Sequence, residues 1–217
     1  MVDQAEARWR MVESQLRPND VTDKRLLAAM GSVPREAFVD PSRAQLAYLD
    51  QSLPAPGGQR QLAAPMPLAR LIQLAAIAPG ERVLHVGASS GYATAILARL
   101  AAEVVAVEAD AGLAAHAART LAGQGVGNTR ILEGSYEAAR AHAPFDAIML
   151  EGVVEEVPPG LLQMLTDGGR LVGLLRENGR TRAHVLVRSG HKAAGYPEFD
   201  ATMPELPGFK RPNGFVF

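Results

Sequence analysis

The sequence has 217 residues, of which 47% are hydrophobic and 21% are charged, with a net charge of -1 at pH 7. This composition is typical of one large globular domain or of a domain with an extension. The balanced charge provides no electrostatic attraction to nucleic acid or to an anionic membrane, so neither partner is expected. No apolar run has the length of a membrane span, and the absence of cysteine excludes disulfides, thiolate metal sites and cysteine nucleophiles. We therefore expect a cytoplasmic protein.

Residues 1–80 predict an N-terminal helical extension that precedes the main domain. Trp9, Val12 and Leu16 have the spacing of residues on one helical face, and prolines interrupt the pattern that follows. The stretch LPAPGG predicts a loop, and Pro67 suits the first turn of the helix after it.

From residue 81 short apolar strands alternate with helical stretches. The predicted strands are RVLHV, EVVAVE, TRILE, FDAIML and GRLVGLL, and the predicted helices span 91–101, 111–124 and 159–166. Such alternation predicts right-handed βαβ units. The fold class is therefore α/β, with a doubly wound, mostly parallel sheet between layers of helices.

The end of the chain departs from this repeat. The stretches RLVGLL and AHVLVR flank Asn178-Gly179, a dipeptide that favours a tight hairpin because both residues accept positive φ. An antiparallel hairpin at the end of a parallel sheet is typical of class I methyltransferases and unusual in dinucleotide dehydrogenases. We divide the chain into an extension at 1–80, a Rossmann-like domain at 81–195 and a tail at 196–217 that packs back on the domain.

The stretch VLHVGASSGY carries a glycine loop between a predicted strand and a predicted helix. A dinucleotide fingerprint needs glycine at three places, of which Gly87 fills one, while Ser89 and Tyr92 fill the others. The spacing G-x-G-x-G of folds that bind S-adenosylmethionine is met at Gly87 and Gly91. Glycine allows the backbone to approach a ligand closely and adopts positive φ at low cost. The loop therefore favours S-adenosylmethionine as the cofactor.

Acidic residues at two other strand ends extend the predicted site. Glu108 ends the second strand, where a carboxylate can accept hydrogen bonds from ribose hydroxyls. Glu151 follows FDAIML at a carboxyl strand end, where it either faces a ligand or forms part of a solvated helix start. Tyr92 either packs over the cofactor or fastens the next helix to the sheet.

A serine hydrolase is a rival interpretation of the same loop. Ser89, Asp146 and His184 follow one another in the chain order of a hydrolase triad. However, Asp146 precedes its strand and His184 lies inside the hairpin, so both are predicted to point away from Ser89. The five histidines show no metal-ligand spacing, and no metal site is expected.

Five phrases along the chain together form a recognisable set, namely MVESQLRPNDVTDKRLLAAMGSVPREAFV, AYLDQSLPAPGGQ, VLHVGASSGY, HAPFDAIML and EEVPPGLLQMLTDGGRLV. On these phrases the chain resembles the protein-L-isoaspartate O-methyltransferase family. The resemblance implies a class I Rossmann-like methyltransferase domain with S-adenosylmethionine as the methyl donor. It also implies that the methyl acceptor is the carboxylate of isoaspartyl residues in damaged proteins.

The chain departs from the family pattern at four places. The loop GQRQLAAP has no serine or threonine where the family has a hydroxyl residue beside the substrate. His85 stands in place of an acidic residue, Ser89 in place of the middle glycine, and Glu133-Gly134-Ser135 in place of G-D-G. Arg60 is either a carboxylate-orienting donor or a solvated loop residue, since a guanidinium presents a forked pair of N–H groups.

Two sets of site residues result. The predicted cofactor-binding residues are His85, Gly87, Ser89, Gly91, Tyr92, Glu108, Gly134, Ser135 and Glu151. The predicted catalytic residues are Gln59 and Arg60. An alternative is a non-catalytic protein of the same fold that has kept the pocket for binding or regulation.

Overall fold

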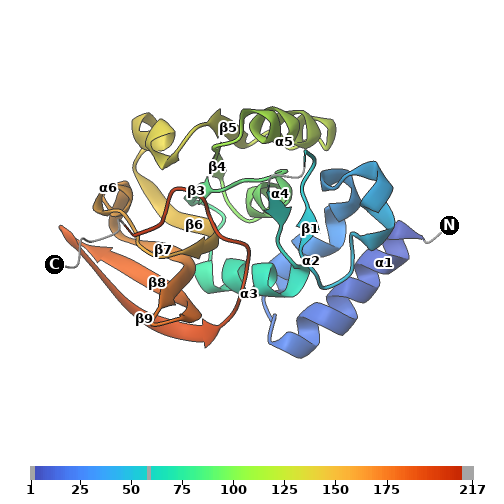
Figure 1. The fold of residues 1–217 in the computed structure, drawn as a ribbon, viewed down its shortest axis with the longest axis horizontal. Coiled ribbons are helices and arrows are strands. Elements are labelled where there is room, and N and C mark those ends of the chain that lie inside the picture. Colours follow the sequence, from blue (N-terminus) through green and yellow to red (C-terminus); the bar gives the residue numbers. More distant parts are fainter. Residues whose placement is uncertain (1–2, 58–59, 212–217) are drawn as a thin grey trace.

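The computed structural model describes residues 3–57 and 60–211. At its centre lies a seven-stranded sheet with the strand order β5-β4-β3-β6-β7-β8-β9 (Figure 1). The parallel strands are β3 (Arg82–Val86), β4 (Glu103–Glu108), β5 (Thr129–Glu133), β6 (Phe145–Val154) and β7 (Leu165–Glu177). The predicted doubly wound, mostly parallel α/β sheet is confirmed.

Two antiparallel strands, β8 (Arg180–Ser189) and β9 (Lys192–Asp200), complete the sheet. The hairpin between β7 and β8 turns at Asn178 and Gly179, with φ of 51° and 76°, as the dipeptide predicts. Strand β9 is a correction, because the sequence analysis treats residues from 196 on as a tail. Pro197 argues against a strand in the sequence pattern. Proline is nevertheless tolerated at a sheet edge, where one side of the strand needs no hydrogen-bond partner.

The described part of the chain has six α-helices, namely α1 (Gln4–Met11), α2 (Lys24–Ser32), α3 (Pro65–Ala75), α4 (Tyr92–Ala98), α5 (Ala111–Gly123) and α6 (Pro159–Leu162). Helix α6 is shorter than predicted because Leu165 already pairs with Phe145 in the sheet. A small antiparallel ladder joins β1 (Leu53–Pro54) to β2 (Gln61–Leu62). None of the helices at 3–57 and 60–211 is both long enough and apolar enough to cross a bilayer.

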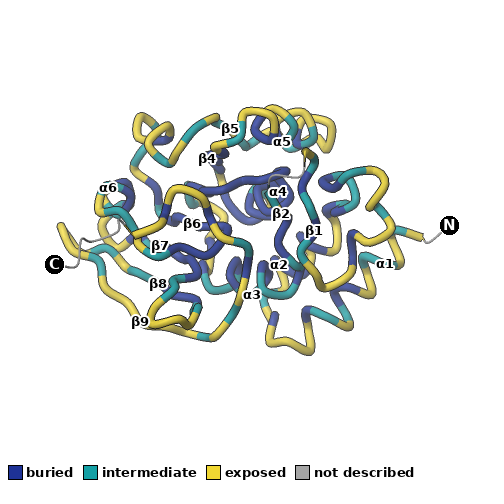
Figure 2. Tube along the Cα trace, in the orientation of Figure 1, coloured by how far each residue is buried: buried dark blue, intermediate teal, exposed yellow. Residues whose placement is uncertain are grey.

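The central strands are buried on both faces (Figure 2). Along β3, Val83 belongs to the core under the N-terminal helices, while Leu84 and Val86 belong to the core under α6 and the C-terminal segment. This alternation follows from the pleat of a strand, which points successive side chains to opposite faces. Because both faces of the central strands are buried, their sequences are almost uninterrupted apolar runs.

Helices α1 and α2 of the N-terminal extension lie at one end of the molecule, opposite β8 and β9, whereas α3 packs against the sheet (Figure 1). Helix α1 continues into a π-helical turn at Val12–Leu16, where Val12 and Leu16 are buried but Trp9 remains 62% exposed. The prediction that Trp9 shares their face is wrong, because the wider turn rotates the residues after it relative to α1. Arg35 is fully buried and donates to the carbonyls of Ala47 and Ala63 at 2.7 and 2.6 Å, which ties the extension to the loop before α3.

Candidate active site

The glycine loop connects β3 to α4 at the carboxyl edge of the sheet. Gly87, Ser89 and Gly91 all adopt the left-handed region, with φ of 88°, 50° and 94°. The N–H groups of Gly87 and Ala88 both donate to the carbonyl of Val107, at 3.0 Å each, so the loop is tied to the end of β4. Two of the three left-handed positions hold glycine, and Ser89 carries the backbone strain that its Cβ imposes there.

Glu108 at the end of β4 organises the loop. Its carboxylate accepts hydrogen bonds from the backbone N–H of Ser89 at 2.7 Å and of Asp110 at 3.1 Å. The side chain is 1% exposed and lies 3.8 Å from the guanidinium of Arg60. The Glu108 carbonyl also accepts from Gly134 at 2.9 Å, which places the turn after β5 beside the glycine loop.

A pocket of about 180 Å³ opens over this edge of the sheet. It is walled by the ends of three parallel strands and by the chain's C-terminal segment, and its lining consists of Arg60, Val86, Gly87, Val107, Ala109, Gly134, Ser135, Tyr136, Leu206, Pro207, Gly208 and Phe209. Four of the predicted site residues, Arg60, Gly87, Gly134 and Ser135, line it. The wall is mostly apolar, with two aromatic rings, Tyr136 and Phe209, whose centroids are 6.0 Å apart.

The C-terminal segment forms one side of the pocket, and the sequence analysis missed this. After β9 the chain runs beside the end of β6 (Figure 1), where Val153 exchanges hydrogen bonds with the carbonyl of Pro204 and the N–H of Leu206, both 2.9 Å long. Leu206 and Phe209 are 4% and 6% exposed. The only sequence signal was the apolar, proline-rich composition of the segment, which predicts packing without indicating against what. The closing residues 212–217 lie outside the described part of the chain.

His85 and Glu151 lie on the other side of the glycine loop, in the core. The His85 Nδ1 atom is 2.9 Å from the hydroxyl of Thr94, and its Nε2 atom is 3.0 Å from a Glu151 carboxylate oxygen. The geometry of this second contact is not that of a hydrogen bond, and both Glu151 oxygens lack a hydrogen-bond partner within the described chain. The pair is therefore a close polar contact between two buried side chains.

Tyr92 is fully buried beneath the N-terminal extension. Its ring makes an edge contact with Phe38, at a centroid distance of 5.7 Å, and lies under the Arg35 guanidinium, 4.8 Å away. Burial raises the pKa of the Tyr92 hydroxyl. Tyr92 is not among the residues that line the pocket, so its position matches the alternative role of fastening α4.

Of the two predicted catalytic residues, the structure describes one. Gln59 lies outside the described residues. The Arg60 side chain is 11% exposed, which does not match a solvated loop residue, and it reaches from the start of β2 toward Glu108. Arg60 and the cofactor-site candidate Glu108 are therefore neighbours.

The residues of the hydrolase alternative do not meet. Ser89 Oγ lies 3.5 Å from the carbonyl of Gln61, whereas Asp146 accepts from the backbone N–H of Arg82, at the opposite end of β3. His184 pairs with Gly173 within the hairpin. A triad requires a hydrogen-bonded chain from serine to histidine to carboxylate, so this interpretation is wrong.

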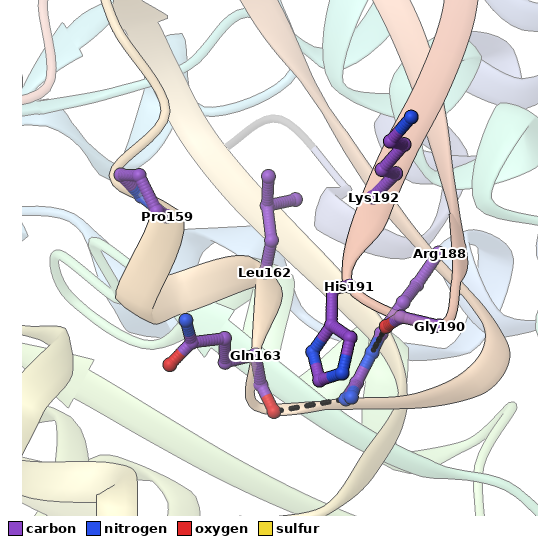
Figure 3. A pocket seen from close by; sticks show the side chains of 7 residues that line it. All are labelled: Pro159, Leu162, Gln163, Arg188, Gly190, His191 and Lys192. Carbon is purple, nitrogen blue, oxygen red and sulfur yellow. Dashed lines mark hydrogen bonds between the residues drawn. The ribbon is translucent and has the colours of Figure 1, made fainter.

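A second hollow lies between α6 and the β8–β9 turn (Figure 3). Arg188 dominates it and donates to the carbonyls of Gln163 at 3.0 Å and Gly190 at 2.9 Å. The guanidinium thus fastens the turn to the chain after α6. Because these carbonyls take up its donors, we assign the hollow a structural role.

Comparison with known proteins gives a consistent result. A family model described as protein-L-isoaspartate(D-aspartate) O-methyltransferase matches residues 7–199. A "Protein-L-isoaspartate O-methyltransferase 2" from Anaeromyxobacter is 42% identical over 181 residues, covering 83% of this chain and 74% of the relative. A protein-L-isoaspartate O-methyltransferase from Methanoregula boonei is 38% identical over 189 residues, covering 87% of each.

Solved structures agree on the fold. A protein-L-isoaspartate O-methyltransferase superposes with a TM-score of 0.80 at 21% identity, covering 95% of this chain and 66% of that one. A putative enzyme of this name from Plasmodium falciparum, in complex with S-adenosyl-L-homocysteine, has a TM-score of 0.76 at 18% identity and covers 95% and 99%. The match of the family model, the identity of the relatives and the shared fold show that the chain belongs to the protein-L-isoaspartate O-methyltransferase family.

Proposed function

We propose that this protein is an S-adenosylmethionine-dependent carboxyl O-methyltransferase that acts on isoaspartyl residues of damaged proteins. Membership of the family over residues 7–199 is the observation that carries the proposal. The glycine loop, the carboxylate of Glu108 and the adjoining pocket support it, because they combine the three features that a nucleoside-containing cofactor needs at a strand edge. The cytoplasmic location expected from the cysteine-free sequence is part of the same proposal.

The residues present suit the adenosine part of the cofactor. A Cβ on Gly87 would stand 2.4 Å from Leu206 Cδ1 and 3.3 Å from the Glu151 carbonyl, so only glycine allows other groups to lie this close to the backbone here. Val107, Tyr136 and Phe209 offer apolar surface for a purine. A carboxylate has about four acceptor sites, and backbone N–H groups use two of those of Glu108, which leaves capacity for ribose hydroxyls.

The pocket is smaller than the ~300–1,000 Å³ usual for a whole ligand of this size. Arg60 and Leu206 are the side chains that lie nearest to Gly87 in the pocket, and a change of their rotamers would widen it. In this proposal Gly87, Ser89, Gly91, Glu108, Gly134 and Ser135 hold the cofactor. His85 and Glu151 support the loop from the core.

The chemistry requires little of the protein beyond alignment. The cofactor, when bound, supplies an electrophilic methyl group. The acceptor carboxylate has an ordinary pKa near ~4 and is ionised at neutral pH, so no residue has to act as a general base. The chain's own part is to hold the carboxylate oxygen in line and to exclude water, an effect that can contribute several kcal/mol. Arg60, with Gln59 beside it in the sequence, is our candidate for orienting that carboxylate.

Transfer of labelled methyl to an isoaspartyl peptide tests the proposal, with the same peptide containing ordinary aspartate as the control. We expect transfer to the isoaspartyl peptide alone. Binding of S-adenosylhomocysteine without any transfer would instead favour the non-catalytic alternative. Absence of binding would contradict both.

A further inference from the structure

Arg60 lies in the pocket that we propose for the cofactor, although it belongs to the loop expected to contact the acceptor. Its backbone is held in place, because its carbonyl accepts a hydrogen bond from Ala55 at 2.9 Å. Its side chain extends inward, with Nη1 3.8 Å from Glu108 Oε1 and Nη2 3.2 Å from the position of a Cβ on Gly87. The guanidinium therefore spans the carboxylate and the glycine loop.

Glu108 has one free side, and Arg60 covers it. Oε2 already accepts from Ser89 and Oε1 from Asp110, so the hydrogen-bond capacity directed toward the backbone is in use. The Arg60 guanidinium lies 3.8 Å from Oε1 and lines the pocket, whereas Glu108 is not among the lining residues. Ribose hydroxyls that approach through the pocket need this same side of the carboxylate.

Charge separates the two partners further. Arginine stays protonated at any working pH, and the sulfonium of the proposed cofactor is also positive. Two cations in one small pocket would repel each other, more strongly where little water screens them. A bound cofactor would therefore disfavour the present position of Arg60, which lines this pocket.

We propose that Arg60 and the cofactor's ribose exchange places on Glu108, and that the exchange directs the Arg60 guanidinium to the acceptor carboxylate. This inference rests on the proposed function. The movement is a rotation of a long side chain on a backbone that stays in place. The cofactor should therefore bind before the acceptor, because the Arg60 guanidinium reaches the acceptor site only after the cofactor has bound.

Calorimetry with S-adenosylhomocysteine tests whether Arg60 and the ribose compete for Glu108. In the variant Arg60→Ala no ion pair has to be broken, so S-adenosylhomocysteine should bind about tenfold tighter than to the natural protein, a difference of ~1.4 kcal/mol. Glu108→Gln should bind it about tenfold more weakly. Arg43→Ala, which removes an exposed arginine from another part of the extension, is the matched control and should change nothing. Unchanged or weaker binding to Arg60→Ala would overturn the exchange.

Fluorescence anisotropy of a labelled isoaspartyl peptide tests whether the exchange directs Arg60 to the acceptor. S-adenosylhomocysteine should raise the affinity of the natural protein for the peptide by at least about fivefold. The peptide should raise the affinity for S-adenosylhomocysteine by the same factor, because such coupling is reciprocal. In Arg60→Ala the coupling should vanish. Arg60→Lys, which keeps the charge but not the fork, should retain part of it.

Binding of S-adenosylhomocysteine separates failure of the proposed function from failure of the exchange. If the natural protein does not bind S-adenosylhomocysteine at all, the proposed function is wrong. If the protein binds S-adenosylhomocysteine but its affinity for the peptide does not depend on that compound, the proposed function stands and the exchange is wrong. Thermal unfolding of each variant checks that the fold is intact.

Discussion

The His85 Nε2 atom and a Glu151 carboxylate oxygen lie 3.0 Å apart on neighbouring strands, with side chains that are 0% and 3% exposed. The family pattern has an acidic residue in the place of His85. Here a carboxyl group is on β6 and an imidazole is on β3, so the buried site still has a carboxyl group next to the glycine loop. Thr94 holds the other nitrogen of the ring and fixes its orientation.

Removing one member of this pair should destabilise the protein. We expect Glu151→Gln to lower the free energy of unfolding by about 1–3 kcal/mol, as is typical when a buried polar contact loses one partner. Urea denaturation at neutral pH measures the change. The double variant His85→Gln, Glu151→Gln should recover part of the loss, because the two sites are coupled. If the losses of Glu151→Gln and of His85→Gln, measured separately, add up to the loss of the double variant, the contact is not energetically important.

Ser89 should be less favourable than glycine at its position. Its φ of 50° is left-handed, a conformation that costs a residue with a Cβ about 1 kcal/mol relative to glycine. We expect Ser89→Gly to be at least as stable as the natural protein. Ser89→Ala keeps the strained backbone and loses the hydroxyl contact to Gln61, so it should be the least stable of the three. The melting temperatures of the three proteins test this. A higher melting temperature for Ser89→Ala than for Ser89→Gly would contradict backbone strain at this position.

Gly87 and Gly57 form a matched pair with nearly the same φ, 88° and 89°. A Cβ on Gly57 meets nothing within 4 Å, whereas one on Gly87 would stand 2.4 Å from Leu206. Gly57→Ala should therefore cost only backbone strain, about 1 kcal/mol. Gly87→Ala should cost about 1–3 kcal/mol more and should also weaken binding of S-adenosylhomocysteine. Equal losses of stability in the two variants would argue against the tight approach of the C-terminal segment.

The ion pair between Glu81 and Arg170 predicts a pH dependence of stability. Two parallel contacts of 2.8 and 2.6 Å from the Arg170 guanidinium lower the pKa of Glu81 below its ordinary value of 4.5. A carboxyl with a lowered folded pKa stabilises the protein above its unfolded pKa and loses that contribution as pH falls through the folded value. Glu81→Gln should therefore be about 1 kcal/mol less stable at pH 7.

The difference between the natural protein and Glu81→Gln should shrink once the pH drops below 4.5. Chemical denaturation of both proteins at several pH values measures it. Glu13→Gln, at an exposed helical pair with Arg17, serves as the control and should show no such trend. A difference that persists unchanged in acid would contradict the assignment.

Local patterns were sufficient for much of this protein. The alternation of strands and helices, the glycine loop and the dipeptide Asn178-Gly179 each express a short-range rule, because backbone φ and the pleat of a strand depend on neighbours in the chain. The family resemblance likewise followed from phrases that can be read along the sequence.

Long-range contacts were beyond these rules. Strand β9 forms because β8 offers an edge, and the pocket has a wall because Leu206 and Phe209 return to β6 from far along the chain. The approach of Arg60 to Glu108 and of His85 to Glu151 joins residues on separate elements. Such contacts depend on how the layers pack together, and no spacing within a single element encodes them.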